Sequence, residues 1–184
     1  TEDNKIDKFD INYNELKEVI NLKFKEDTDY VPMTTTKVNY DKVISFTFDD
    51  GPSKYTSEIM DVLDEYGYKA TFFQVGYMIR SQSDIVKEVV ERGFEVGNHT
   101  TDHSNLNKLK PDKAKSKLTD NNDLFYSITG QTMELIRPPY GLANDKIKAV
   151  IDKPIIKWSV DTRDWESRKT EKIVELTKAQ TKDG

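Results

Sequence analysis

The sequence of 184 residues contains no cysteine and only two histidines. Without cysteine there are no disulfides, thiolate metal ligands or cysteine nucleophiles, so any metal site must use imidazole and carboxylate groups. No apolar run approaches the roughly 18 residues that a membrane-spanning helix needs. Positive charge is not in excess either, because 28 basic and 33 acidic side chains give a formal net charge of −5. This balance argues against a nucleic-acid partner.

Residues 1–36 differ in pattern from the rest of the chain. Leu16, Val19 and Ile20 form a weak helical stripe, and acidic residues, a proline and a run of threonines follow it. We expect a short helix and a linker here, either the tail of a preceding domain or a disordered leader. The first residue is threonine and no signal peptide is recognisable, so we expect a processed chain or a piece of a longer one.

From residue 37 to residue 184, β-rich runs alternate with segments whose apolar residues recur at helical spacing. The expected strands are 43–48, 70–75, 94–97, 133–136 and 155–160, and the expected helices are 56–66, 83–92, 111–128, 144–151 and 170–181. This alternation is typical of an α/β domain with a parallel sheet. The sequence ends after a helix and a glycine, where another strand is due, so we expect part of a repeating architecture.

Polar residues that can carry chemistry follow the expected strands directly. In chain order they are Asp49, Asp50, His99, His103, Arg137 and Asp161. The carboxyl ends of parallel strands meet at one edge of a sheet, and that edge holds the active site in open α/β sheets and in βα barrels. We therefore expect these side chains to form one site.

The two histidines stand four residues apart, in Gly-Asn-His-Thr-Thr-Asp-His (97–103). Neutral imidazole is the commonest metal ligand, and positions i and i+4 of a helical turn face the same way. Catalytic zinc takes three protein ligands, so this pair and one carboxylate would complete such a site. The alternative is a pair of polar loop histidines, one of which caps the following helix.

Asp49 and Asp50 precede Gly51 and Pro52, and this order alone indicates a turn. The strand before them is apolar and is expected to be buried, where two unpaired carboxylates would be costly. A bound cation would supply a partner. Since neighbouring strand residues point in opposite directions, one carboxylate could ligate the metal while the other acts on a metal-bound water.

Two further motifs contain candidate residues. In Arg-Pro-Pro-Tyr-Gly (137–141) the prolines fix the backbone, and Arg137 could pair with a carboxylate of the site. The alternative is a rigid turn with a surface arginine. In Asp-Thr-Arg-Asp-Trp (161–165), Asp161 could orient a histidine, and Trp165 could form the wall of a sugar pocket or belong to the core.

Taken together and in this order, the four motifs resemble those of the polysaccharide deacetylase family, whose members carry the NodB homology domain and belong to carbohydrate esterase family 4. The matching segments are 47–52, 99–103, 137–141 and 161–165, within a resemblance that spans about residues 42–184. The resemblance implies a distorted (β/α) barrel in residues 37–184, with about five of the family's roughly seven strands present. It also implies metal-dependent hydrolysis of N-acetyl groups.

The resemblance assigns roles to the residues at the strand ends. Asp50, His99 and His103 would match the family's metal ligands, and these donors suit zinc first, with cobalt, nickel and iron(II) as alternatives. Asp49 would match the catalytic base. Arg137 would match the residue that pairs with this base and orients it.

Three further residues would lie near the substrate. The backbone N–H of Tyr140 would match part of the oxyanion hole, and its side chain would match a substrate contact. Asp161 would match the residue that tunes the catalytic acid. Trp165 would match a pocket wall. That acid is the histidine of a Leu-x-His motif on a later strand, and no histidine follows His103 in this sequence. We expect either a chain that continues further or a non-acting relative, and weak or no amide cleavage by these 184 residues alone.

In its tyrosine at position 140, the sequence resembles the relatives that act on N-acetylglucosamine. Relatives that act on muramic acid carry arginine at this position. We therefore expect an N-acetylglucosamine-containing polysaccharide, first of all peptidoglycan, with chitin oligomers, acetylated xylan and poly-N-acetylglucosamine open. The Lys-, Asn- and Asp-rich composition suggests a low-GC bacterium. For such a bacterium the family resemblance implies a secreted cell-wall hydrolase at the cell surface. The alternatives are a glycan-binding domain without turnover and a metal hydrolase for another ester or amide.

Overall fold

The computed structural model describes residues 44–182, which fall into two compact units, 44–157 and 158–182. The helix and linker expected in residues 1–36 lie outside the described residues, as does the expected domain boundary at residue 37. No helix within the described range is both long enough and apolar enough to cross a membrane.

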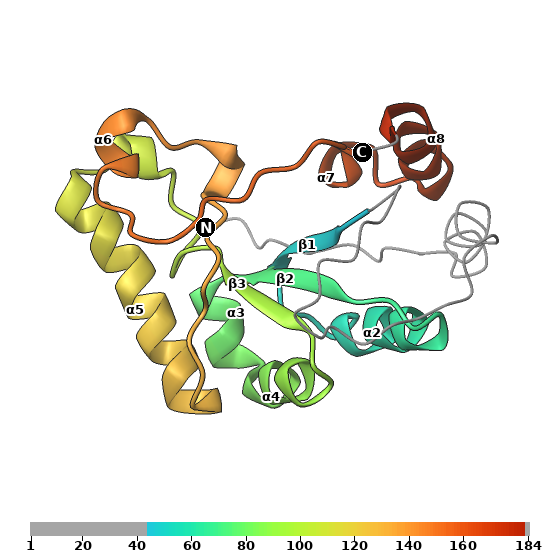
Figure 1. Cartoon of the computed structure of the whole chain (residues 1–184), viewed down its shortest axis with the longest axis horizontal. Helices are drawn as coiled ribbons and strands as arrows, with labels where there is room; N and C mark the ends of the chain where they lie inside the picture. The colour runs from blue at the N-terminus through green and yellow to red at the C-terminus, as the bar shows by residue number, and fades with distance from the viewer. Residues whose placement is uncertain (1–43, 183–184) are drawn as a thin grey trace, which may run out of the picture. The chain divides into compact units, whose positions relative to one another are not determined.

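A three-stranded parallel sheet forms the centre of the larger unit (Figure 1). Its strands are β1 (Phe46–Gly51), β2 (Ala70–Gln74) and β3 (Glu95–Asn98), in that spatial order. Phe48 pairs with Phe72, and Phe72 pairs with Val96. The three expected strands in this part of the sequence are therefore present, and all run in the direction that an α/β domain requires.

Helices make the crossovers between these parallel strands. α2 (Thr56–Glu65) connects β1 to β2, and α3 (Gly76–Ser81) with α4 (Ser83–Glu91) connects β2 to β3. These three helices lie on the same side of the sheet (Figure 1). Their buried apolar residues form the main core with the sheet and include Met60, Leu63, Phe72, Ile79, Val86, Val89 and Val96. α3 is an element that the sequence pattern did not predict.

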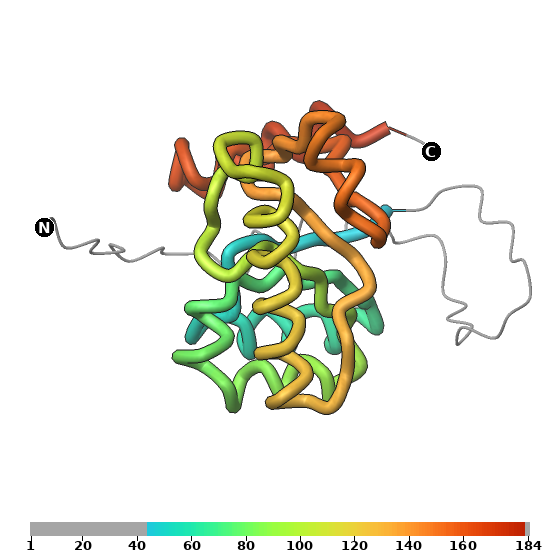
Figure 2. The backbone as a smooth tube through the Cα atoms, turned by 90° about the vertical axis from the view of Figure 1, so that its left-hand side faces the viewer, coloured from blue at the N-terminus to red at the C-terminus, as the bar shows by residue number. Residues whose placement is uncertain are grey.

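The segments expected as a fourth and a fifth strand extend the sheet only at single positions. α5 (Pro111–Thr129) follows β3, and the chain then runs back alongside this helix (Figure 1, Figure 2). Parallel bridges join Asn98 to Ile136 and Ile136 to Ile155. Pro138 and Pro154 flank these positions and have no N–H to donate, so regular pairing does not extend further. The expected strand order holds, although these last two strands are shortened to bridges.

Phe73 of β2 packs tightly against β3 and against Arg137. Phe73 is fully buried, and the guanidinium of Arg137 lies 4.1 Å from the centre of its ring. Position 97 of β3 must be glycine here, since a Cβ atom would lie 2.3 Å from a carbon of the Phe73 ring. A 3-10 turn (Pro139–Gly141) and the short helix α6 (Asp145–Lys148) follow Arg137, and α6 is shorter than the expected helix at 144–151.

The smaller unit contains α7 (Asp164–Ser167) and α8 (Thr170–Gln180). The sequence pattern predicted α8 but not α7. The side-chain amide of Gln180 links α8 to the start of this unit, because it accepts from the N–H of Asp161 and donates to the carbonyl of Asp161, both at 2.9 Å. Neither helix contains a buried residue.

Candidate metal and catalytic site

The end of β1 and the loop after β3 bring together the three residues expected to bind a metal. One ligand atom each from Asp50, His99 and His103 lies within 4.8 Å of the others. The Oδ1 atom of Asp50 lies 3.4 Å from Nε2 of His99 and 3.3 Å from Nε2 of His103. His99 is buried, whereas the Asp50 side chain is 63 % exposed, so the cluster opens to solvent on the Asp50 side.

A hydrogen bond fixes the proton of His99 on the far side of its ring. Nδ1 of His99 lies 2.5 Å from the carbonyl oxygen of Arg137. A carbonyl can only accept, so Nδ1 carries the hydrogen, and in a neutral ring the lone pair of Nε2 then points toward Asp50. This second contact of a metal-binding histidine is the usual way in which its tautomer and orientation are set.

The resulting arrangement suits a cation. A lone pair on Nε2 of His99 facing a carboxylate oxygen places two acceptors against each other, and a cation between them would satisfy both. Burial lowers the pKa of His103 despite the charge of Asp50, which favours the neutral, ligating form of that ring. Burial acts to raise the pKa of Asp50, but the two neighbouring imidazoles outweigh it and lower that pKa, so Asp50 is the anionic member.

Asp49 points to a different partner from Asp50. Its Oδ1 accepts a hydrogen bond of 2.7 Å from Nη1 of Arg137, a side chain that is only 2 % exposed. The guanidinium also donates to Oγ1 of Thr47 at 2.8 Å and to the carbonyls of Ile156 and Lys157. Burial raises the pKa of Asp49 and outweighs the opposing charges of His99 and Arg137. Asp49 is thus a held carboxylate with increased basicity.

Backbone strain concentrates at the same place. Asp50, Thr100, His103 and Tyr140 all have positive φ, at 66°, 69°, 56° and 61°. For residues other than glycine this conformation costs of order 1–3 kcal/mol and persists only where surrounding contacts impose it. Four such residues around one cluster of titratable groups indicate a site that the fold holds in a fixed shape.

Of the remaining candidate residues, one joins this cluster and two do not lie in the same unit. The ring of Tyr140 meets that of His103 edge-on, with centroids 4.9 Å apart, and Tyr140 is 61 % exposed. Asp161 and Trp165 belong to the smaller unit. There Oδ1 of Asp161 accepts from the N–H of Arg163 at 3.1 Å, and Trp165 is 66 % exposed, which excludes the core position considered for it.

Three residues that support the site were not singled out from the sequence. Thr47 lies two residues before Asp49 on β1, and strand alternation could have placed it beside the same arginine. Asn98 and Asn121 form a buried hydrogen-bonded pair behind His99. A signal for Asn121 exists in the spacing, because it lies on the buried face of α5 between Leu118 and Phe125.

Comparison with known proteins assigns this geometry to a family. Residues 36–154, more than half of the chain, match the family model described as polysaccharide deacetylase. The chain belongs to the polysaccharide deacetylase family. The match includes the Asp49–Asp50 pair, both histidines and the Arg137 motif.

Bacterial relatives of this polysaccharide deacetylase family are similar over most of the chain. Peptidoglycan-N-acetylmuramic acid deacetylase PdaC of Bacillus subtilis (strain 168) is 34 % identical over 174 residues, which are 94 % of this chain and 37 % of that protein. Peptidoglycan-N-acetylglucosamine deacetylase PgdA of Listeria monocytogenes serotype 1/2a (strain 10403S) is 36 % identical over 149 residues, 80 % of this chain and 32 % of that protein. The chain thus spans about a third of the length of these two relatives.

The fold agrees with a solved member of the polysaccharide deacetylase family. The structure of peptidoglycan deacetylase PdaC from Bacillus subtilis matches with a TM-score of 0.75 and 35 % identity, over 78 % of this chain and 71 % of that one. This similarity supports the expected fold class, an α/β domain whose parallel sheet corresponds to part of a NodB-type barrel.

Proposed function

We propose that this protein hydrolyses N-acetyl groups on N-acetylglucosamine residues of a polysaccharide, most specifically bacterial peptidoglycan, and that it uses a divalent metal held by Asp50, His99 and His103. Zinc fits the two imidazoles and one carboxylate, and cobalt, nickel or iron(II) fit the same donors. When bound, such a metal polarises a carbonyl and lowers the pKa of a coordinated water. The meeting of these three ligand atoms within 4.8 Å is the observation that carries the proposal.

Asp49 is the proposed general base. It lies next to the metal ligand Asp50 in the chain, and burial raises its pKa, which makes it a better proton acceptor than an exposed aspartate. Arg137 holds its Oδ1 atom at 2.7 Å and thereby orients the other oxygen for proton transfer. Removing the proton from the attacking water at this position is the step that Asp49 contributes.

Tyr140 and two residues of the smaller unit are proposed to serve the substrate. The left-handed backbone of Tyr140 is strained, and we assign its N–H to stabilising the negative charge that develops on the acetyl oxygen. Its exposed ring and the exposed indole of Trp165 offer flat apolar surfaces that can contact sugar rings. Asp161 is assigned to tuning the group that protonates the departing amine.

The choice of sugar rests on Tyr140 and on the relatives. One relative is named for N-acetylmuramic acid and another for N-acetylglucosamine, so peptidoglycan is common to both. We favour N-acetylglucosamine because position 140 is tyrosine, the residue expected for that class. Because peptidoglycan is the proposed substrate, we also propose that the protein acts at the bacterial cell surface.

Acetate release from N-acetylglucosamine oligomers and from purified peptidoglycan tests this proposal directly. The protein is loaded with zinc and compared with Asp49→Asn and with Asp145→Asn, a matched change at a fully exposed aspartate on α6. From these 184 residues we expect slow release that requires metal and falls to the background rate in Asp49→Asn, consistent with loss of a general base. The Asp145→Asn variant should match the wild type.

A glycan-binding module is the second candidate for this part of the chain, because residues 104–184 contain no histidine. Without a histidine to protonate the leaving amine, the same site would bind a metal and a glycan but not cleave the amide. Stoichiometric metal binding and glycan binding with no acetate release from either substrate would favour this binding module over the enzyme.

A further inference from the structure

Asn121 is a fully buried polar residue in the middle of α5. Its Nδ2 atom donates two hydrogen bonds, one of 3.1 Å to the carbonyl oxygen of Gln74 and one of 3.0 Å to Oδ1 of Asn98. Both neighbours are oxygens that can only accept, so the orientation of the amide is determined by its surroundings. The side chain therefore links the ends of β2 and β3 to a helix that lies outside the sheet.

Both of these oxygens also bind the backbone of the histidine loop. The carbonyl of Gln74 accepts from the N–H of His99 at 3.1 Å, and Oδ1 of Asn98 accepts from the N–H of Thr100 at 2.9 Å. A further bond of 2.8 Å, from Nδ2 of Asn98 to the carbonyl of Leu118, joins the same asparagine to α5. The two side-chain hydrogen bonds of Asn121 therefore go to the same oxygens that accept from the backbone N–H groups of His99 and Thr100.

The loop at this point needs such support. Thr100 has φ of 69°, a conformation that a non-glycine residue keeps only when its surroundings impose it. The space around Asn121 is also filled, since a Cβ on Gly76 would lie 2.7 Å from Oδ1 of Asn121 and 2.9 Å from Cα of Thr101. Gly76 and Thr101 thus lie directly against the oxygen side of the Asn121 amide.

We propose that Asn121 is a positioning residue for the metal site, which acts on His99 through Gln74 and Asn98 and thereby sets the affinity for the metal. The inference rests on the proposed metal site. Residues that orient a ligating histidine from behind contribute about 10- to 100-fold to metal affinity in other proteins. Two contacts separate Asn121 from the ligand, so the lower end of that range is expected.

The test compares Asn121→Ala with Asn122→Ala. Asn122 is the next residue on the same helix, and its Oδ1 accepts from the N–H of Met133 at 2.8 Å, so its loss also removes a hydrogen bond between the helix and the rest of the unit. Zinc affinity is measured by competition with a chromophoric chelator. We expect the dissociation constant to rise about 10-fold in Asn121→Ala and to stay unchanged in Asn122→Ala.

A second readout needs no metal. Amide hydrogen exchange at His99 and Thr100 in the metal-free protein should become about 10-fold faster in Asn121→Ala, because the two oxygens lose the donor that holds them. The same amides should keep their protection in Asn122→Ala. If Asn121→Ala does not fold, Asn121→Ser, which keeps one hydroxyl donor, should show the same changes at smaller size.

The outcomes separate this inference from the function on which it rests. A wild-type protein that binds no zinc would overturn the metal site and this inference with it. A wild-type protein that binds zinc, together with Asn121 variants of unchanged affinity and unchanged exchange at His99 and Thr100, would overturn only the role of Asn121. Equal loss of affinity in Asn122→Ala would also overturn it, because the effect would then be one of general stability.

Discussion

At the scale of single residues, Arg137 connects the chemistry of the site to the folding of the chain. Its guanidinium is buried and donates to Asp49, to Thr47 and to two backbone carbonyls, while its own carbonyl accepts from His99. It also lies over the ring of Phe73. Arginine suits this position because its planar fork can satisfy several acceptors at once, which a lysine ammonium cannot do with the same geometry.

The pair of Arg137 and Asp49 should show strong coupling in stability. In Arg137→Met the carboxylate of Asp49 stays half-buried without its cation, so we expect the free energy of unfolding to fall by roughly 3–5 kcal/mol. Because burial already raises the pKa of Asp49, losing the arginine will raise that pKa further and leave more of the carboxyl protonated at neutral pH.

Urea denaturation of the metal-free protein measures this as a double-mutant cycle. The double variant Arg137→Met with Asp49→Asn should be more stable than the sum of the single changes allows, by about 2 kcal/mol. Additive costs, within about 0.5 kcal/mol, would mean that the arginine acts through the carbonyls and the aromatic ring alone.

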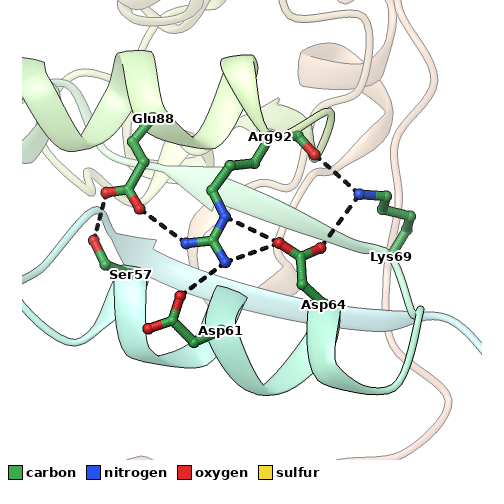
Figure 3. A network of polar contacts seen from close by, with 6 residues as sticks. All are labelled: Ser57, Asp61, Asp64, Lys69, Glu88 and Arg92. Atoms are coloured by element: carbon green, nitrogen blue, oxygen red, sulfur yellow. Dashed lines mark hydrogen bonds and ion pairs between the residues drawn. The ribbon is translucent and has the colours of Figure 1, made fainter.

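At the scale of elements, a cluster of charged side chains joins α2 to α4, two helices on the same side of the sheet (Figure 3). Arg92, directly after α4, contacts Asp61 and Asp64 of α2 and Glu88 of its own helix, at 2.8–2.9 Å. Burial acts to lower the pKa of Arg92, but the hydrogen bonds to Asp64, Glu88 and Asp61 outweigh it and raise the pKa, so the guanidinium stays charged at every accessible pH.

Removing this cation should cost little, although it has three partners. The side chains of Asp61, Asp64 and Glu88 are 70 %, 40 % and 37 % exposed, so solvent weakens each contact. We expect Arg92→Met to lower the free energy of unfolding by about 1 kcal/mol at low salt and by less in about 1 M NaCl.

The matched control for Arg92→Met is Lys148→Met. Lys148 forms a single exposed pair with Asp145 within α6, and its loss should cost less than about 0.5 kcal/mol. An Arg92→Met deficit that stays the same size in high salt would show that the alkyl part of the side chain, and not its charge, packs the two helices together.

The regular elements are also those that the sequence predicted best. α2, α4, α5 and the first three strands agree with the periodicity within a few residues, because each buries a continuous apolar face. Two short helices, α3 and α7, were not predicted, since each has too few residues to show a period. The strands expected at 133–136 and 155–160 reduce to bridges at Ile136 and Ile155, because prolines beside them remove backbone donors.

At the scale of the whole molecule, the sequence predicts those parts of the site whose positions follow from the order of the strands along the chain. Residues at the carboxyl ends of parallel strands must meet, and this rule alone brings Asp49, Asp50, the histidines and Arg137 together. The contribution of α5 could not be predicted in this way. Whether a polar helix residue faces solvent or a buried carbonyl depends on packing across the fold, and Asn121 is of the second kind.

Metal binding should therefore stabilise the fold as a whole. Asp50 lies at the end of one strand of the sheet and both histidines follow another, so a metal that binds all three ties β1 to β3 in the native state, while the unfolded chain has no such assembled site. At a free zinc concentration of about 100 times the dissociation constant, we expect the free energy of unfolding to rise by about 2.7 kcal/mol. Thermal unfolding with and without zinc, and again after a chelator is added, measures this gain.

Asp50→Asn keeps the size of the side chain but removes its charge, so it should unfold as the metal-free protein does and gain little from zinc. A gain of the same size in Asp50→Asn would place the stabilising metal away from Asp50 and against the proposed ligand set.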